Sequence, residues 1–279
     1  EALHAAVDQL AAAFDPRWGG FGAAPKFPPC GGLELLLRHH HRTGDRAALE
    51  MVEKTLDGMK NGGLYDHLGG GFARYSTDER WLVPHFEKML YDNAQLARIY
   101  LWAFQVTESP EYARVARETL DYVVREMQGA EGGYFSATDA DSEGEEGKFF
   151  VWTPEQVHAL LPPDQAEKFC GFYDVREGGN WEGHSILNTP RPDPELTQAL
   201  APARAKLYAA RRARVPPLLD DKVLAAWNGL MIGAMAEGAR VLGDRRYLES
   251  AERAADFVLD RMLRPDGGLF RTARGGTAH

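Results

Sequence analysis

The sequence predicts a mainly α-helical protein built from αα-hairpin repeats, with short β segments in the loops that join them. Apolar residues recur with helical spacing over long stretches, and no run of alternating residues is long enough for a large sheet. Tight turns at 41–50, 107–116 and 242–251 each join two helical stretches of similar length. A glycine pair before a hydrophobic or aromatic residue also recurs, as expected where repeated helices end.

The predicted helices follow from the apolar periodicity and from the positions of the turns and glycine pairs. They span residues 2–14, 32–42, 45–60, 84–107, 110–127, 154–161, 195–213, 222–242 and 244–263. The glycine pairs stand in "FDPRWGGF", "MKNGGLYD", "MQGAEGGYFSATD" and "MLRPDGGLFRT". The hairpins are joined by long, unequal connections, which favour a ring whose loops gather at one rim; a solenoid of stacked hairpins would have short, uniform linkers.

Composition limits the function classes. The 279 residues carry a formal net charge of −9 and no basic run, which argues against a general affinity for nucleic acid. No apolar run reaches the roughly 20 residues of a membrane helix, and no targeting segment stands at the start. Cys30 and Cys170 lie far apart without metal-site spacing, so two reduced cysteines in a cytoplasmic protein are expected.

Three motifs carry a family resemblance. They are "GGLYDHLGGGFARYSTDERWLVPHFEKMLYDNAQL" at 62–96, "GGYFSATDADSEGEEGKFFVWT" at 132–153 and "DDKVLAAWNGLMI" at 220–232. The chain resembles the spermatogenesis-associated protein 20 family, which implies a thioredoxin-like domain followed by an (α/α)6 toroid related to six-hairpin glycosidases and N-acylglucosamine 2-epimerases. The thioredoxin-like part is absent from these residues. We expect residues 1–279 to form a single, incomplete toroid-type domain of about three and a half hairpins.

An incomplete ring leaves apolar helix faces uncovered. We therefore expect self-association, or covering by the missing hairpins of a longer parent chain.

The segment "HFEKMLYDNAQL" at 85–96 places ionisable residues beside an apolar helix face. With a helix starting at Pro84, His85 and Glu87 fall in its first turn, and Lys88 and Asp92 lie on one flank. One interpretation is structural, with Lys88 and Asp92 paired four residues apart and Glu87 complementing the helix N-terminus. The other places these side chains at a site facing a central cavity.

The loop before this helix mixes glycines with aromatic and polar residues. Such a mixture suits sugars, whose C–H faces stack on aromatic rings while their hydroxyls bond to polar groups, although a core-capping loop is the alternative. Its candidate substrate-binding residues are Tyr65, His67, Arg74, Tyr75 and Trp81. Trp181 and His184 repeat the mixture in "GGNWEGHSILN" at 178–188.

Carboxylates recur in two further segments. Asp139 and Asp141 begin a pattern like half a calcium loop, but Phe150 stands where an EF-hand needs glutamate, so a turn between strands at "GGYFSA" and "GKFFVW" is favoured. Asp220 and Asp221 precede a helix containing Trp227 and Asn228. One aspartate would suffice as an N-cap, which leaves the second to explain. No metal and no cofactor is expected.

Two classes of function fit these patterns. The first is a carbohydrate-active domain acting on a small saccharide, with His85, Glu87, Asp139, Asp220 and Asp221 as candidate catalytic residues. Glycoside hydrolysis would pair Asp139 or Glu87 with Asp220 or Asp221, whereas epimerisation would use His85 and His184 as acid and base. The second is a non-catalytic binding or scaffold domain associated with a thioredoxin-like module. A helical fragment without an autonomous role is the remaining alternative.

Overall fold

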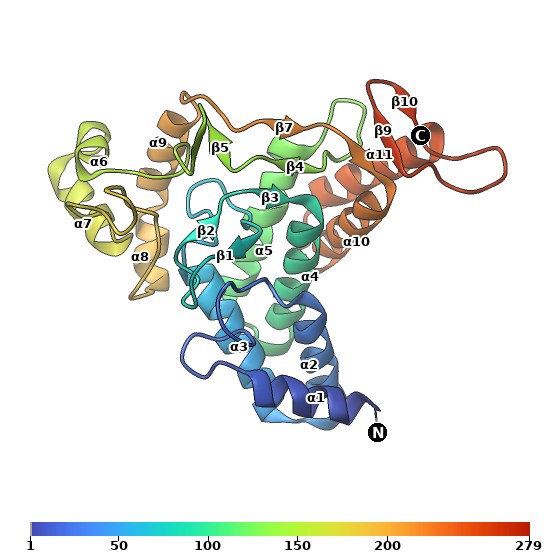
Figure 1. The fold of residues 1–279 in the computed structure, drawn as a ribbon, viewed down its shortest axis with the longest axis horizontal. Coiled ribbons are helices and arrows are strands. Elements are labelled where there is room, and N and C mark those ends of the chain that lie inside the picture. Colours follow the sequence, from blue (N-terminus) through green and yellow to red (C-terminus); the bar gives the residue numbers. More distant parts are fainter. Residues whose placement is uncertain (1) are drawn as a thin grey trace. The chain divides into compact units, whose positions relative to one another are not determined.

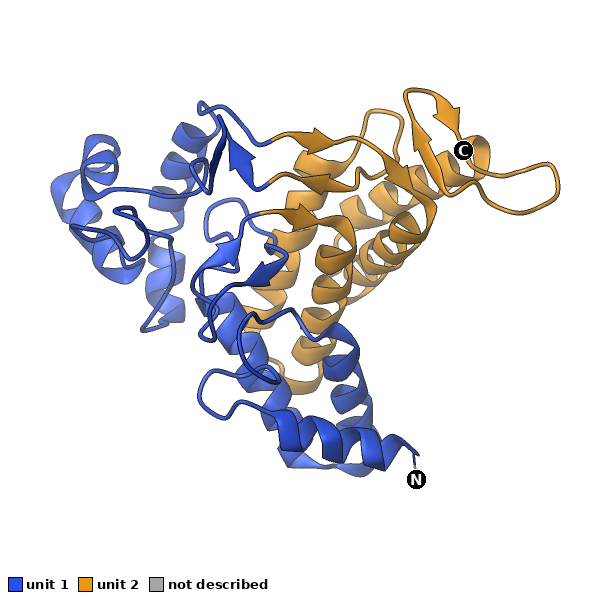
Figure 2. Cartoon of the chain, viewed as in Figure 1, with its two compact units in different colours: residues 1–86, 140–217 blue, residues 87–139, 218–279 orange. Residues whose placement is uncertain are grey.

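The computed structural model describes residues 2–279 (Figure 1). Within them lie eleven α-helices, one π-helical turn and ten short strands, so the mainly α-helical class with short β segments is confirmed. The chain forms two compact units, shown in Figure 2. Unit 1 comprises residues 1–86 and 140–217, and unit 2 comprises residues 87–139 and 218–279. The expectation of a single, incomplete toroid-type domain stays a prediction.

Unit 1 begins with three helices, α1 (Ala2–Ala13), α2 (Cys30–Thr43) and α3 (Arg46–Asn61). The turn between α2 and α3 explains their hairpin. Gly44 takes a left-handed conformation with φ of 75° after α2. The Asp45 carboxylate then accepts hydrogen bonds from two backbone amides in the first turn of α3. Two short strands follow, β1 (Tyr75–Ser76) and β2 (Pro84–His85), which pair antiparallel.

The second part of unit 1 opens with a small β-hairpin, β5 (Asp141–Ser142) and β6 (Glu145–Glu146). Its turn uses two left-handed residues, Glu143 and Gly144, with φ of 55° and 79°. Four helices follow: α6 (Pro154–Leu160), α7 (Pro163–Phe172), α8 (Pro194–Ala199) and α9 (Ala201–Arg211). They enclose one apolar cluster that includes Trp152, Phe169 and Leu207.

Unit 2 holds two αα-hairpins. The first joins α4 (Leu90–Thr107) to α5 (Pro110–Tyr122), which continues into a π-helical turn, η1 (Val123–Met127), and the second joins α10 (Ala225–Leu242) to α11 (Arg245–Arg261). Three strands pair in the order β3 (Lys88–Met89), β4 (Ala137–Thr138) and β7 (Leu219–Asp220). Three others pair in the order β10 (Thr277–Ala278), β9 (Thr272–Arg274) and β8 (Val223–Leu224).

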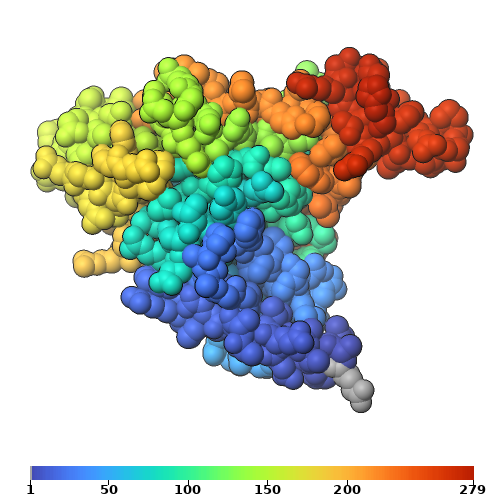
Figure 3. Space-filling model, viewed as in Figure 1, coloured from blue at the N-terminus to red at the C-terminus, as the bar shows by residue number. Residues whose placement is uncertain are grey.

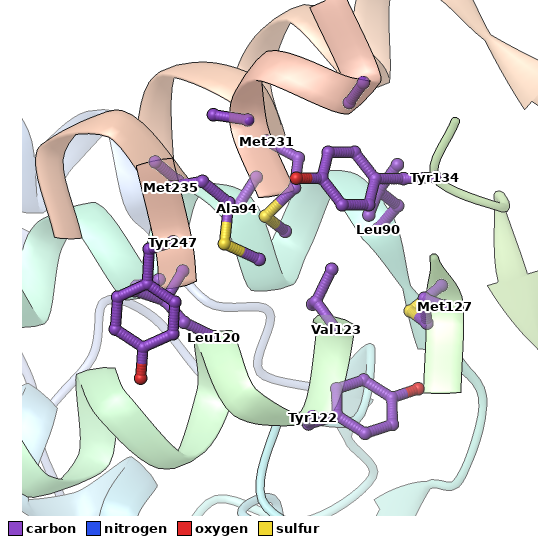
Figure 4. Close-up of a cluster of buried hydrophobic side chains, with 14 residues drawn as sticks. Leu90, Ala94, Leu120, Tyr122, Val123, Met127, Tyr134, Met231, Met235 and Tyr247 are labelled. Atoms are coloured by element: carbon purple, nitrogen blue, oxygen red, sulfur yellow. The ribbon is translucent and has the colours of Figure 1, made fainter. Parts of the chain in front are cut away.

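The core of unit 2 lies where α4 and α10 pack together, with α5 and α11 against them. Figure 4 shows the side chains that fill it, among them Leu90 and Ala94 from α4, Leu120 from α5, and Met231 and Met235 from α10. All five are fully buried. The burial of these apolar side chains is the main source of stability of the two hairpins, because each helix would otherwise expose an apolar face to water.

Several helix boundaries differ from those predicted. The helix expected at 84–107 begins at Leu90, because 84–85 and 88–89 pair as strands with other segments. The positions of His85 and Glu87 in a first helical turn, and of Lys88 on a helix, were therefore wrong. The helix expected at 222–242 begins at Ala225, since Val223 and Leu224 pair with β9.

Two further differences concern unit 1. The helix expected at 195–213 is two helices, α8 and α9, which meet at Leu200. The helix α7 was not predicted. The turn expected between strands at 132–137 and 147–152 lies instead inside β5–β6, at 143–144.

Among the helices of residues 2–279, none has both the length and the apolar character needed to cross a bilayer.

An ion pair fixes the turn at residues 15–20, which we call the first glycine turn of unit 1. Lys26 is 2% exposed, and its Nζ lies 2.5 Å from Asp15 Oδ2 and 2.8 Å from the carbonyl oxygen of Gly19. Burial alone would raise the pKa of Asp15, but the hydrogen bond from Lys26 and those from the Trp18 and Arg17 amides outweigh it, so this pKa lies below its usual value. The turn therefore depends on an ionised carboxylate.

We predict that Asp15→Asn lowers the free energy of unfolding by about 3 kcal/mol at neutral pH, because it leaves the Lys26 ammonium buried without its carboxylate. The folded-state pKa of Asp15 is lowered. The stabilisation by Asp15 is thus fully present above its unfolded-state pKa of about 3.9. It is lost as pH falls through the lower pKa of the folded state. Urea unfolding at neutral and acidic pH measures both effects. Asp8→Asn on the exposed face of α1 is the control, and an equal loss in both variants would contradict the prediction.

A buried amide joins α10 to the segment after η1. Asn228 Oδ1 accepts from the Tyr134 backbone N–H at 2.8 Å, and Nδ2 donates to the Tyr134 carbonyl at 2.9 Å. The Tyr134 hydroxyl lies 2.7 Å from Ser250 Oγ on α11, and burial raises the pKa of Tyr134 to about 12. These bonds satisfy both backbone groups of Tyr134 inside the unit 2 core.

We predict that Asn228→Leu, which keeps the side-chain size but removes the amide, destabilises the protein by about 2–4 kcal/mol, because two buried backbone groups lose their partners. Thermal or urea unfolding measures the change. Glu252→Ala, an exposed substitution on α11, should shift stability by no more than about 0.5 kcal/mol. A wild-type unfolding curve for Asn228→Leu would show that the amide is not an anchor.

Candidate active site

The three-stranded sheet β3–β4–β7 brings together segments that precede α4, follow η1 and precede α10 (Figure 1). Lys88 pairs with Thr138, and Met89 with Ala137. On the other side of β4, Ala137 pairs with Asp220 and Thr138 with Leu219. Three separate connections of unit 2 therefore meet on one small sheet.

The register places three predicted catalytic carboxylates on one face of this sheet. Asp139 extends β4 by one residue, since its amide donates to the Leu218 carbonyl at 2.8 Å. The last pair of the β3–β4 ladder is Lys88 with Thr138, and Glu87 and Asp139 are the next residues of the two segments. Because side chains alternate along a strand and opposed residues share a face, Glu87, Asp139 and Asp220 lie on the same face. We call this group the acidic face.

Spacing within the acidic face follows from regular sheet geometry. In a regular antiparallel pair, diagonal neighbours, the relation of Asp139 to Asp220, lie about 7–8 Å apart, and their Cβ atoms are somewhat closer. Asp139 is exposed, and Glu87 and Asp220 are half-buried. Asp139 is thus open to solvent, and Glu87 and Asp220 are partly so.

On the opposite face of the sheet, Lys88 is buried and Leu219 is exposed. Lys88 is 3% exposed, and its Nζ lies 4.3 Å from the centre of the Tyr122 ring. The Tyr122 hydroxyl is 3.4 Å from Thr138 Oγ1, on the neighbouring strand. A cation over an aromatic ring in a buried position is a stabilising contact, so Lys88 helps to fix the sheet on the end of α5.

The two aspartates before α10 have separate ionic partners. Asp220 pairs with Lys222 at 2.8 Å, and Asp221 pairs with Arg274 of β9 at 2.6 Å. Neither caps the helix, whose N-cap residue is Leu224 without a side-chain bond. The N-cap interpretation was therefore wrong, because Val223 and Leu224 form a strand between the aspartates and the helix.

The remaining unit 2 candidates lie on helices. Asp92 is buried in the first turn of α4. Trp227 on α10 packs against Tyr91 with ring centres 4.8 Å apart. Asn228 is the amide anchor described above. These three side chains are thus packed into the helical layer beneath the sheet.

In unit 1, His85 belongs to a different cluster. Its Nδ1 lies 2.7 Å from Glu146 Oε1 on β6, and its ring stacks on Tyr75 with centres 5.1 Å apart. Tyr75 in turn stacks on the exposed ring of Phe27, with centres 4.7 Å apart. Glu146 was not singled out in the sequence, because only the β5–β6 hairpin brings it to His85.

A cavity of about 810 Å³ lies beside this hairpin in unit 1. We call it the hairpin cavity. The light green segment around residue 145 in Figure 3 shows that the hairpin reaches the molecular surface. The lining includes carboxylates, a histidine, cations and aromatic rings: Glu143, Glu145, Glu146, Lys148, Phe149, Trp181, Glu182, His184 and Arg214. Asp141 is exposed on β5, next to the lining residue Ser142.

Arg214 closes one wall of the hairpin cavity. Its Nη1 donates to the carbonyl oxygens of Phe149 at 2.9 Å and Val151 at 2.8 Å, and its guanidinium lies 4.1 Å from the centre of the Trp152 ring. Burial, together with the nearby charge of Arg211, lowers the pKa of Arg214 to about 10. The wall is therefore rigid, and it carries positive charge at neutral pH.

Most of the candidate substrate-binding residues of the 62–83 loop are buried in the core of unit 1. Tyr65 and Trp81 are at most 1% exposed, and Trp81 Nε1 donates to the Trp18 carbonyl at 3.0 Å. His67 is also buried, with Nε2 2.9 Å from the Gly62 carbonyl oxygen, and Arg74 is half-buried. This arrangement is the one expected of the core-capping alternative.

No group of three or more metal-ligating side chains is found among residues 2–279. Asp139 and Asp141 lie on different strands, and Asp139 is drawn into the β3–β4–β7 sheet of unit 2.

Comparison with known proteins places the chain among relatives. It is 39% identical to human spermatogenesis-associated protein 20 over 310 aligned residues, and 38% identical to the mouse protein over 311. Each alignment covers 96% of this chain and 39% of the relative, so the chain spans about two-fifths of their length. No known protein-family model matches the chain.

A solved mannanase structure shares the fold. An inactive variant of the α-1,6-mannanase GH76A of a Salegentibacter species, in complex with α-1,6-mannotetrose, superposes with a TM-score of 0.50 at 16% identity, covering 86% of this chain and 48% of the mannanase. A cellobiose 2-epimerase from Bacillus thermoamylovorans gives a TM-score of 0.44 at 12% identity, covering 100% of this chain and 92% of the epimerase. Together with the αα-hairpins, the sequence relatives confirm the resemblance: this chain is a relative of spermatogenesis-associated protein 20.

Proposed function

We propose that this chain is a carbohydrate-active domain that hydrolyses a glycosidic bond at the acidic face. The observation that carries the proposal is the sheet register, which sets Glu87, Asp139 and Asp220 on one face. Glycoside hydrolysis needs two carboxyl groups on opposite sides of the scissile bond. The acidic face supplies them from separate segments, as such a site requires.

Spacing favours Asp139 and Asp220 as the working pair. Inverting glycosidases hold their carboxyl groups about 6.5–9.5 Å apart, with room for a water molecule between carboxylate and sugar. Diagonal neighbours in a regular antiparallel sheet, the relation of Asp139 to Asp220, lie about 7–8 Å apart, a backbone separation that is compatible with such a carboxyl distance. Glu87, which directly precedes β3, would hold sugar hydroxyls.

We assign the two proton-transfer roles from the ion pair of Asp220. Asp220 is paired with Lys222, which suits the base that takes a proton from water. Asp139 would then donate its proton to the leaving oxygen as the C–O bond breaks, while the water oxygen bonds to the anomeric carbon. The water proton passes to Asp220, and the two carboxyl groups exchange protons with solvent before the next cycle.

Two further observations support a saccharide as the ligand. The mannanase with the same fold is in complex with α-1,6-mannotetrose, which makes α-1,6-linked mannosides the first compounds to test. In unit 1, the hairpin cavity of about 810 Å³ combines aromatic rings with carboxylates and cations. A cavity of that size and lining suits a small saccharide, whose apolar ring faces stack on aromatic side chains.

We predict that Asp139→Asn and Asp220→Asn each lower kcat/KM for saccharide hydrolysis by about 10²–10⁴-fold, because each removes one proton-transfer group. The measurement is product release from a panel of mannosides and glucosides, with the anomer formed first identified by NMR. Inversion is expected from the Asp139 and Asp220 spacing. Binding of the same saccharides to both variants should stay within a few-fold of the parent, since the amides keep the size and polarity of the acids.

The control is Glu252→Gln, which removes one exposed carboxylate from α11 of the same unit and should retain full activity. Equal activity in the parent and both aspartate variants would exclude the acidic face as the catalytic site. If the parent binds saccharides but hydrolyses none, the protein is a binding domain, the alternative also favoured by the sequence. If it neither binds nor hydrolyses any member of the panel, the proposed carbohydrate function is wrong.

A further inference from the structure

A second cavity of unit 1, of about 580 Å³, is lined by an excess of cations. We call it the basic cavity. It lies between the first glycine turn, the C-terminal part of α3, Arg80 and Leu82, and the segments 174–176 and 188–192. Four cations line it, Arg17, Lys54, Arg80 and Arg176, against two carboxylates, Asp57 and Asp174. This positive balance stands out in a chain whose net charge is −9.

The ionic contacts leave most of this positive charge available. Asp174 lies 3.7 Å from Arg176, and Asp57 lies 3.3 Å from Lys60, so both carboxylates have cationic neighbours of their own. Within residues 2–279, Arg17, Lys54 and Arg80 form no ion pair with any carboxylate. Cations without an ion-pair partner that line one cavity raise the local concentration of anions.

A hydrogen-bond donor in the lining has no acceptor. Trp18 lines the basic cavity, and its Nε1 is buried without a hydrogen-bond partner among the residues described. The Arg17 guanidinium lies 4.9 Å from the centre of the Trp18 ring. A buried N–H without an acceptor costs free energy, and an oxygen of a bound ligand would remove that cost.

The walls of the basic cavity are fixed before any ligand binds. A Cβ atom at Gly58 would lie 2.6 Å from the Trp18 carbonyl oxygen, so only glycine lets the first turn rest on α3 here. On the opposite side, the Thr189 amide donates to the Asn61 carbonyl at 2.7 Å, and Asn188 Nδ2 lies 3.3 Å from Asp174 Oδ2. Preorganised walls reduce the entropy lost on binding.

We propose that the basic cavity binds a small anionic molecule through a phosphate or carboxylate group, held by Arg17, Lys54 and Arg80. Guanidinium groups match both kinds of anion with paired hydrogen bonds, and the ammonium adds a point charge. The volume admits a ligand of sugar-phosphate or uronic-acid size. The inference is independent of hydrolysis at the acidic face, because every lining residue belongs to unit 1.

The test is calorimetry of the full chain with inorganic phosphate, glucose 6-phosphate, glucuronate and glucose. Binding of one or more of the three anions, weakened by added salt, and no binding of glucose are expected. Affinity for phosphate but not glucuronate assigns a phosphoryl ligand, and the reverse assigns a carboxylate. The triple variant Arg17→Ala/Lys54→Ala/Arg80→Ala should weaken binding at least about tenfold, since each charge-assisted contact is worth about that factor.

A charge-matched control removes three exposed cations elsewhere in unit 1, in the variant Arg42→Ala/Lys168→Ala/Lys206→Ala. It should keep the parent affinity. Trp18→Phe retains the ring but removes the buried N–H, and it should weaken binding several-fold. The proposal is overturned if the parent binds none of the anions, if glucose binds as tightly as they do, or if both triple variants weaken binding equally. Thermal melting shows that each variant is folded.

Discussion

The pairing of one short strand with two others organises the candidate active site. β4 lies between β3 and β7, so a single dipeptide, Ala137–Thr138, holds the segment before α4 beside the segment before α10. Without that pairing, Glu87, Asp139 and Asp220 would be three unrelated loop residues. With it, they acquire a fixed register, and register determines which side chains share a face.

Such a short sheet does not stabilise itself, so its position depends on the helices beneath it. On one face, the buried Lys88 lies over the ring of Tyr122, at the end of α5. Behind the sheet, Asn228 on α10 holds both backbone groups of Tyr134, just before β4. The α4–α10 core thus fixes the strands, and the strands fix the carboxylates.

The sequence predicted the hairpins because their helices are long enough for apolar spacing to repeat several times. It did not predict the start of α4 at Leu90. A two-residue strand is too short to show a periodic pattern, and its partner lies far along the chain, so Pro84 was taken for the start of a helix.

The candidate site could be predicted only to the same extent. Glu87, Asp139 and Asp220 were singled out because each stands beside a crossover, but their shared face follows only from the register. Nothing in the sequence distinguishes Glu146, the partner of His85, from the neighbouring glutamates. Only the β5–β6 hairpin brings it to His85.

Asn228 shows a different limit. Its position beside Trp227 and after two aspartates resembled that of a ligand-binding residue, and nothing in a sequence distinguishes an amide that meets a ligand from one that meets the backbone. The structure shows it fully buried, with its side-chain amide hydrogen-bonded to main-chain atoms of Tyr134 and Leu224. Burial of the neighbouring segment, rather than the residue type, decides its role.

The acidic face itself is the strongest physical reason to look for chemistry there. Carboxylates gathered on one small sheet repel one another, which is destabilising. Lys88 is buried on the other face of β3, and Lys222 pairs with Asp220. A local arrangement that opposes stability, on a sheet otherwise fixed by buried contacts, is typical of functional sites. The carboxylates therefore support the proposed acid and base roles more strongly than their residue types alone would.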